Sequence, residues 1–266
     1  MTVAEARATT RRVARTFALA CRLLPPGVRD DVYLLYLVFR TLDDLVDERR
    51  PEAAERVGAA AAWASRSGAA AATPEVVILR DLATRHALPR EAFADFCAGM
   101  KQDLRGERPM TEADVDRYCY RVAGTVGLVM ASILGMRDPE RARPAAAALG
   151  MAMQRTNILR DIDEDLASGR SYLAAEVLDR LGGPEPGRRA ALLRDQIARA
   201  DALYEQGIAG IPLLRRGGRA VAAAAFMYRE ILRQIEREGY GSRAGRAVVP
   251  ARRRLLVAAR GVALAR

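Results

Sequence analysis

The sequence predicts an all-α fold, and three observations support this prediction. Alanine, leucine and arginine dominate the 266 residues, and all three favour helices. Half of the residues are hydrophobic, yet only 5% are aromatic. No run rich in valine, isoleucine and threonine alternates with polar residues in the way that a half-buried strand does. We therefore expect helices throughout and no sheet.

Proline and glycine divide the first part of the chain into helices. The alanine-rich helix among them carries the single tryptophan, Trp63, and we expect it on the surface or in a packing role. The expected helices cover residues 2–24, 29–50, part of 51–74, 75–85 and 89–104.

The next helix begins near Thr111, where Asp114 lies in the first turn as in a capped helix start. It contains Gly124 and Gly127, each of which costs about 1 kcal/mol relative to alanine inside a helix. Two explanations stay open: tight helix packing, or a helix that breaks to line a cavity. The remaining expected elements are a loop over 136–144, a helix over 145–166, a turn over 169–173, a linker over 182–187, and helices over 188–207, 219–238 and 250–265.

The stretch 154–165 carries the clearest chemical pattern. Read as a helix, it places Gln154, Asn157, Asp161 and Asp165 on one stripe. Two carboxylates one turn apart, with amides before them, suit a magnesium ion that also holds a phosphate. Arg160 lies beside them and is suited to pair with phosphate oxygens. The alternative is an acidic helix end in solvent.

A second acidic pair, Asp43 and Asp47, lies one turn apart on another apolar helix, whose same face continues to Arg40 and Tyr36. The intervening 45–46 pair is apolar, so this cluster is at least partly buried. Burying carboxylates costs several kcal/mol each unless they are paired or bind metal. Two mostly apolar acidic helices from distant parts of the chain predict a single domain over residues 1–266, a helical bundle with a polar mouth.

The net charge of +10 permits nucleic acid, anionic lipid or diphosphate as a partner. The three cysteines and the single histidine, His86, lack zinc-site spacing, so we expect buried thiols in a reducing cytoplasm and assign His86 no role. No apolar run approaches about 18 residues, and no membrane span is expected. Residues 243–266 contain arginines, no acids and Leu255-Leu256-Val257, which predicts peripheral association with an anionic membrane.

The chain resembles the squalene and phytoene synthases, which are head-to-head prenyl transferases. The resemblance rests on five linked elements in order, and it implies the isoprenoid-synthase (class I terpenoid synthase) fold with a central cavity. Asp163 stands where a glycine is usual, and Ala14, Phe39 and Ala174 also depart from the pattern. The five elements are residues 15–17 with 23–26, then 36–48, 118–127, 154–172, and the C-terminal group of 209–212, 228–232 and 239–240.

The resemblance also implies which residues act. Magnesium, with manganese as the alternative ion, is expected on Asp43, Asp47, Asn157, Asp161 and Asp165, and the four aspartates are expected to be catalytic. Tyr172 is expected near the reacting carbons. Contacts with diphosphate or the metal shell are expected from Arg15, Tyr36, Arg40, Gln154, Asn157, Arg160, Tyr228 and Arg246.

The implied reaction joins two prenyl diphosphates through a cyclopropyl diphosphate intermediate, in isoprenoid and carotenoid biosynthesis. Small cavity side chains favour geranylgeranyl diphosphate and phytoene, and no NADPH is expected. One alternative is a squalene or dehydrosqualene synthase that uses farnesyl diphosphate, and another is a terpene cyclase or chain-elongating prenyl transferase on the same fold. A more distant alternative is a non-enzymatic basic helical protein, although no nucleic-acid partner is expected. Chain length, alkene geometry and oligomeric state stay open.

Overall fold

The computed structural model describes residues 2–66 and 71–264, except for the side chain of Arg15. Within these residues the regular structure is helical, and the isolated bridge Met136–Leu214 is the one ladder contact. The all-α prediction is therefore confirmed. In chain order the elements are α1 (Val3–Val13), α2 (Arg15–Cys21), α3 (Pro26–Asp47), α4 (Ala53–Ser65), α5 (Pro74–Arg85), α6 (Arg90–Arg105), α7 (Glu112–Cys119), the π-helix η1 (Tyr120–Gly124), α8 (Thr125–Leu134), α9 (Pro139–Arg160), α10 (Ile162–Ala167), α11 (Ala175–Leu181), α12 (Ala190–Ala209), the 3₁₀ turn η2 (Ile211–Leu213), α13 (Gly218–Arg237) and α14 (Ala251–Leu264).

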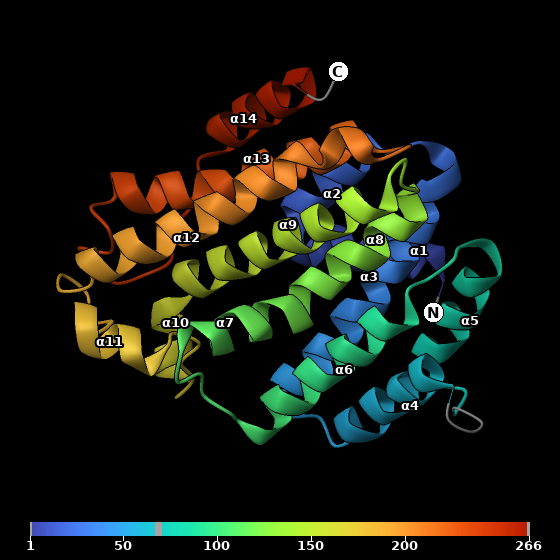
Figure 1. Ribbon diagram of the computed structural model, residues 1–266, viewed down its shortest axis with the longest axis horizontal. Helices are drawn as coiled ribbons and strands as arrows, with labels where there is room; N and C mark the ends of the chain where they lie inside the picture. Colours follow the sequence, from blue (N-terminus) through green and yellow to red (C-terminus); the bar gives the residue numbers. More distant parts are fainter. Residues whose placement is uncertain (1, 67–70, 265–266) are drawn as a thin grey trace.

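Helix α9 runs through the middle of the bundle and packs against α7, α8, α12 and α13 (Figure 1). Helix α3 forms a second centre, in contact with α1, α4, α5, α6 and α8. Two hydrophobic clusters of buried side chains follow these two centres. Helix α14 lies across α13 on the outside of the bundle (Figure 1).

The expected first helix is two helices, and this prediction was wrong. Ala14 interrupts it with φ −129° and ψ 62°. Helix α1 packs against α3, where Arg7 Nη2 lies 2.5 Å from Asp30 Oδ1, whereas α2 packs against α13. Two different partners impose two directions, so tertiary packing overrides the helix propensity of alanine.

Two further boundaries differ from expectation. Helix α9 begins at Pro139 rather than at residue 145, because the Asp138 side chain accepts a hydrogen bond from the Arg141 amide at 3.2 Å and proline suits the first helical position. Helix α11 occupies a stretch for which no helix was expected. The final helix was expected to reach residue 265, which lies outside the described residues.

Gly124 and Gly127 were expected to mark either tight helix packing or a helix that breaks to line a cavity, and the structure shows both. The helix breaks into a π-turn at Tyr120–Gly124, and it also approaches α9 closely. A Cβ on Gly127 would overlap the Ala146 carbonyl oxygen, and one on Gly150 would lie 2.7 Å from the Ala123 carbonyl carbon. Main chains of α8, η1 and α9 thus touch where they border the cavity.

Three smaller expectations have clear outcomes. Trp63 is buried and packs edge-on against Phe93, with ring centroids 5.3 Å apart, so α4 has a packing role. His86 donates or accepts a 2.6 Å hydrogen bond with Asp31. The cysteines are free and buried as expected, and burial raises the pKa of each thiol to about 12.

Candidate active site

A cavity of about 360 Å³ opens between the two centres of the bundle. Along two helices, the described side chains that border the cavity change from apolar to polar. On α3 the border runs from Val32 to Asp43, and on α9 it runs from Ala142 to Asn157, so both helices become polar toward their C-terminal ends. An apolar chamber with one polar end suits a ligand that has a hydrocarbon chain and a charged head.

The first acidic motif lies at the polar end, in the last turns of α3. Arg40 Nη1 donates to Asp43 Oδ2 at 3.2 Å and also pairs with Asp44. Asp47 Oδ1 accepts a 2.6 Å hydrogen bond from Arg170. Leu45 and Val46 are buried, so the partial burial expected of this motif is confirmed.

The carboxyl groups around this end influence one another. Burial, and next the Asp47 carboxylate, raise the pKa of Asp43 to about 7. Burial and the Asp161 carboxylate raise the pKa of Asp165 to about 6, with a further contribution from Asp47. The carboxylates of the two acidic motifs therefore repel each other across this polar end of the cavity, which we call the mouth. Arg170 lies between them.

The second acidic motif differs from the expected continuous helix. Asp161 ends α9 with φ −101° and ψ 12°, and α10 starts at the next residue. The expected continuous helix over residues 145–166 is therefore wrong at this break. The amides of Asp161 and Asp165 still donate to the carbonyls of Asn157 and Asp161, both at 2.9 Å, so the one-turn spacing of the motif is kept. The carboxylates of residues 163–165 fall in the first turn of α10, where the helix dipole favours negative charge, which explains why a new helix starts there.

Asp161 faces two arginines. Arg160 donates to it from Nε at 2.7 Å and from Nη2 at 2.5 Å. Arg246 Nε lies 2.9 Å from Asp161 Oδ1. Three of the expected site residues thus form one contact group beside the mouth, and Arg160 also interacts with the Tyr228 hydroxyl.

Gln154, Asn157 and Tyr228 border the cavity, as do Tyr36 and Arg40. Asn157 Nδ2 donates to Gln154 Oε1 at 3.3 Å. Its Oδ1 is buried and accepts no hydrogen bond from any residue that the structure describes. A buried amide oxygen left without a donor is the kind of group that a bound cation satisfies.

Tyr172 is not among the described residues that line the cavity, and it lies behind Tyr118. Its ring stacks on Tyr118 with centroids 5.0 Å apart, and Tyr118 itself lines the cavity. The structure thus places Tyr118, rather than Tyr172, directly against the chamber. The expected contact of the Arg15 side chain lies outside the described part of the structure.

Two residues at the mouth were missed by the sequence reasoning. Asp103 accepts a 3.3 Å hydrogen bond from the Tyr118 hydroxyl, while burial and the Asp47 carboxylate raise its pKa to about 7. Arg170 bridges to Asp47. An acid in the apolar context of α6 was the available signal for Asp103, and the sequence gives no spacing rule that links it to α3.

Of the described residues, no three Asp, Glu, Cys or His side chains already enclose one point as a closed metal site does. The carboxylates lie at the mouth with arginines among them instead. The donor set of aspartate oxygens and one amide oxygen is that of magnesium rather than zinc.

Comparisons with known proteins agree with this arrangement. The family model described as squalene/phytoene synthase matches residues 10–253. A 15-cis-phytoene synthase of Synechococcus elongatus is 37% identical over 94% of the chain and 89% of its own length. A phytoene synthase of Thermus thermophilus is 39% identical, over 91% and 86%. A crystal structure of a dehydrosqualene synthase with a ligand superposes with a TM-score of 0.87 at 27% identity, over 98% of this chain and 95% of the other.

Proposed function

This chain belongs to the squalene/phytoene synthase family and is a prenyl transferase, and we propose that it condenses two geranylgeranyl diphosphates head to head to give phytoene. The observation that carries the proposal is the apolar chamber that ends in acids, amides and arginines. Relatives named phytoene synthase, similar over most of their own length, support the choice of product.

The residues at the mouth fit a magnesium site, with manganese as the alternative. The ligands would be Asp43 and the unsatisfied oxygen of Asn157, which line the cavity, together with Asp47, Asp161 and Asp165 beside them. Bound there, the ion would supply positive charge to the departing diphosphate. The raised pKa values of Asp43 and Asp165 support this assignment, because a nearby cation relieves the repulsion between crowded carboxylates.

The protein's own side chains have separable roles in this proposal. Arg40, Arg160 and Arg246 bind and orient diphosphate oxygens, for which guanidinium groups are suited. The apolar wall excludes water from the allylic cation that forms when diphosphate leaves. Tyr118 lines the chamber, and an aromatic ring there is suited to stabilise that cation. The proposed product follows by way of a cyclopropyl diphosphate, without a reductant.

Substrate competition tests the proposal. The purified protein receives geranylgeranyl and farnesyl diphosphates in one tube with magnesium, and the hydrocarbons are separated by chromatography. We expect a 40-carbon product to predominate. A 30-carbon product would instead establish the dehydrosqualene-type alternative.

A variant tests the site itself. Asp161→Asn should reduce turnover by at least about 100-fold, because an amide is a weaker magnesium ligand and a poorer partner for Arg160 and Arg246. Asp179→Asn, at an exposed position of α11, is the control and should retain full turnover. Near-normal turnover of Asp161→Asn would refute the assignment.

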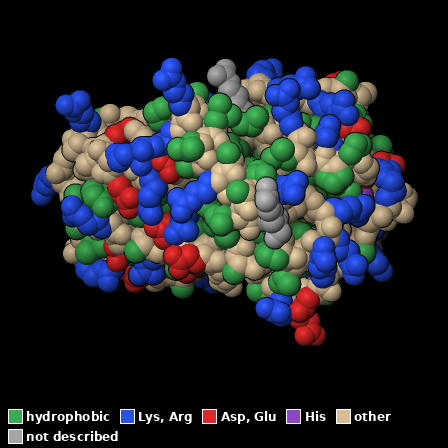
Figure 2. Space-filling model, turned by 90° about the horizontal axis from the view of Figure 1, so that it is seen from above, with side chains coloured by type: hydrophobic (Ala, Val, Ile, Leu, Met, Phe, Trp, Pro, Cys, Tyr) green, Lys and Arg blue, Asp and Glu red, His purple; other side chains and the backbone are tan. Residues whose placement is uncertain are grey.

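We also propose peripheral membrane association through α14. No helix in the described residues is long and apolar enough to cross a bilayer. The face that carries α14 shows many basic and hydrophobic side chains and fewer acidic ones (Figure 2). Leu255 and Leu256 are 57% and 70% exposed beside Arg252, Arg253 and Arg254. This combination suits insertion at an anionic lipid surface.

Vesicle co-sedimentation tests the membrane proposal. Binding to vesicles with 30% phosphatidylserine should fall by about tenfold or more when the three arginines of residues 252–254 become glutamine, since each basic residue contributes about 1 kcal/mol. Equal binding to neutral vesicles, or binding that survives the triple change, would contradict it.

A further inference from the structure

The segment that joins α13 to α14, residues 239–249, lies against the second acidic motif; we name it the strap. It contains no helix of its own. Ala247 and Val249 are buried and anchor its far end. Arg246, next to that anchor, reaches Asp161. A cation of the candidate diphosphate site is therefore carried by irregular backbone, which needs other contacts to fix its position.

Asp163 and Arg189 supply those contacts. Arg189 is 2% exposed and forms a two-pronged pair, with Nη1 2.5 Å from Asp163 Oδ1 and Nη2 2.9 Å from Oδ2. Asp163 Oδ2 also accepts a 2.7 Å hydrogen bond from the amide of Gly245, the residue before Arg246. Arg189 Nη2 donates to the Arg243 carbonyl at 3.2 Å. Both members of the pair thus bind strap backbone within three residues of Arg246.

The strap is also shaped to lie over Arg189. Gly241 has φ +71°, and a Cβ there would overlap the Arg189 guanidinium and lie 2.9 Å from Leu193 Cδ1. Its carbonyl accepts a 3.1 Å hydrogen bond from the Gly187 amide. The same buried arginine therefore touches the strap at its start and in its middle.

We propose that the Asp163–Arg189 pair is a positioning element: it holds the strap so that Arg246 is preset beside Asp161 for a diphosphate group. Asp163 then influences diphosphate affinity through Arg246, without touching the ligand. The inference rests on the proposed function, since it assumes a diphosphate at this mouth. A guanidinium that is already held in place loses less conformational entropy when the ligand arrives, which strengthens binding.

Calorimetric titration with inorganic diphosphate and magnesium tests the inference through a double-mutant cycle. Asp163→Ala should raise the dissociation constant at least about fivefold, the lower end of typical coupling between sites. In the Arg246→Ala background the same change should raise it less than about twofold, because the residue through which Asp163 acts is gone. Asp163→Asn, which keeps the shape and one acceptor, should lie between wild type and Asp163→Ala.

Limited trypsin digestion reports on the strap without any ligand. Cleavage after Arg243 should be at least about fivefold faster in Asp163→Ala than in wild type, because local opening exposes that bond. Asp179→Asn should match wild type in both assays. Unfolding temperatures of all variants show whether a change in affinity accompanies a general loss of structure.

The outcomes separate the two proposals. If wild type binds no diphosphate, the proposed function fails, whatever Asp163 does to the strap. If wild type binds diphosphate but Asp163→Ala binds it equally well, the positioning role is refuted. An effect of Asp163→Ala that is just as large without Arg246 also refutes it, because the residue would then act by another route.

Discussion

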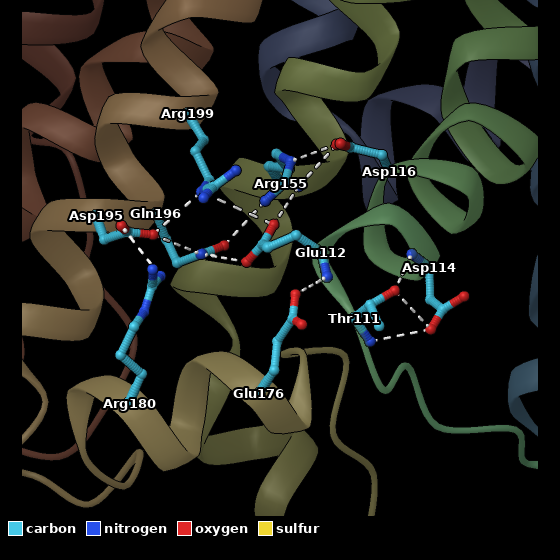
Figure 3. A network of polar contacts seen from close by, with 10 residues as sticks. All are labelled: Thr111, Glu112, Asp114, Asp116, Arg155, Glu176, Arg180, Asp195, Gln196 and Arg199. Carbon is cyan, nitrogen blue, oxygen red and sulfur yellow. Dashed lines mark hydrogen bonds and ion pairs between the residues drawn. The ribbon is translucent and has the colours of Figure 1, made fainter.

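Replacing Arg155 by methionine should destabilise the fold strongly, and the structure gives the size of the effect. Arg155 lies on α9 and is 2% exposed (Figure 3). It donates to Glu112 at 2.7 Å, to Asp116 at 2.7 Å and to Gln196 at 2.9 Å, and so joins α7, α9 and α12. Removing one partner of a buried ion pair costs about 3–5 kcal/mol.

The surroundings place the expected loss near the lower end of that range. The Glu112 side chain is 13% exposed, so its charge stays poorly solvated after the substitution. Gln196 Nε2 still donates to Glu112 at 2.5 Å, and Arg199 Nε lies 3.9 Å away, so part of the charge remains compensated. Asp116 is half-exposed and adds little. We expect a loss of about 3 kcal/mol in the free energy of unfolding.

Urea unfolding followed by circular dichroism measures this loss. Arg117→Met is the matched control, because Arg117 pairs with Asp114 on the exposed side of α7 and should cost less than about 1 kcal/mol. Adding Glu112→Gln to Arg155→Met should recover most of the stability, since it removes the stranded charge. If Arg155→Met costs no more than the control, the network contributes no buried-charge pairing and the reasoning fails.

Three further predictions concern packing, thiols and pH. Gly150→Ala should lower the free energy of unfolding by about 1–3 kcal/mol through overlap with the backbone of η1. Gly58→Ala, where a Cβ meets no atom within 4 Å, should instead raise it by about 0.5–1 kcal/mol in thermal melts. The three cysteines should resist a thiol reagent at pH 8 and all react in guanidinium, because burial raises the pKa of each to about 12. Burial opposes ionisation of Asp31, but hydrogen bonds from Arg85 and His86 outweigh burial and lower the pKa of Asp31. The ionised Asp31 therefore stabilises the fold above pH ~4. In urea titrations, the loss of unfolding free energy caused by Asp31→Asn should fade as the pH falls below that value.

The sequence predicted helices best where periodicity and end signals agree. Helix α3 starts at a proline and places its apolar face inward, and α5 starts at Thr73 and Pro74, so both came out close to expectation. The break at Ala14 was not predictable, because alanine favours helix and no cap marks the break. It results from contacts with α3 and α13, which no local pattern encodes.

The site residues, like the helices, were predictable where a local pattern decides their place and not where tertiary packing does. Asp43 and Asp47 could be grouped from spacing, since one helix turn puts them on one face. Asp103 could not, because its place at the mouth depends on how α6 packs against α3. The spacing argument also assumed an unbroken helix from Gln154 to Asp165, whereas α9 ends at Arg160 and α10 starts at Ile162.

Charge placement gives an independent argument for a cation at the mouth. The chain has a net charge of +10, and Arg56 pairs with Glu75, the acid in the buried part of the described structure. Away from the mouth, the described carboxyl groups with a resolved shift have lowered pKa values, because arginines, hydroxyls or amides donate to them. Among the described carboxyl groups with a resolved shift, the raised pKa values are those of Asp43, Asp103 and Asp165.

This contrast is physically informative because burial of like charges is costly and the chain has basic residues to spare. Arginines pair with Asp43, Asp47 and Asp161 at the mouth. No described arginine forms an ion pair with Asp103 or Asp165, in contrast to Glu112 and Asp163 elsewhere. Burying the carboxyl groups of Asp103 and Asp165 without such a partner opposes their ionisation, which agrees with their raised pKa values. In the function proposed above, a divalent cation bound there would offset these charges, and Arg160 and Arg246 at the rim would hold the diphosphate heads.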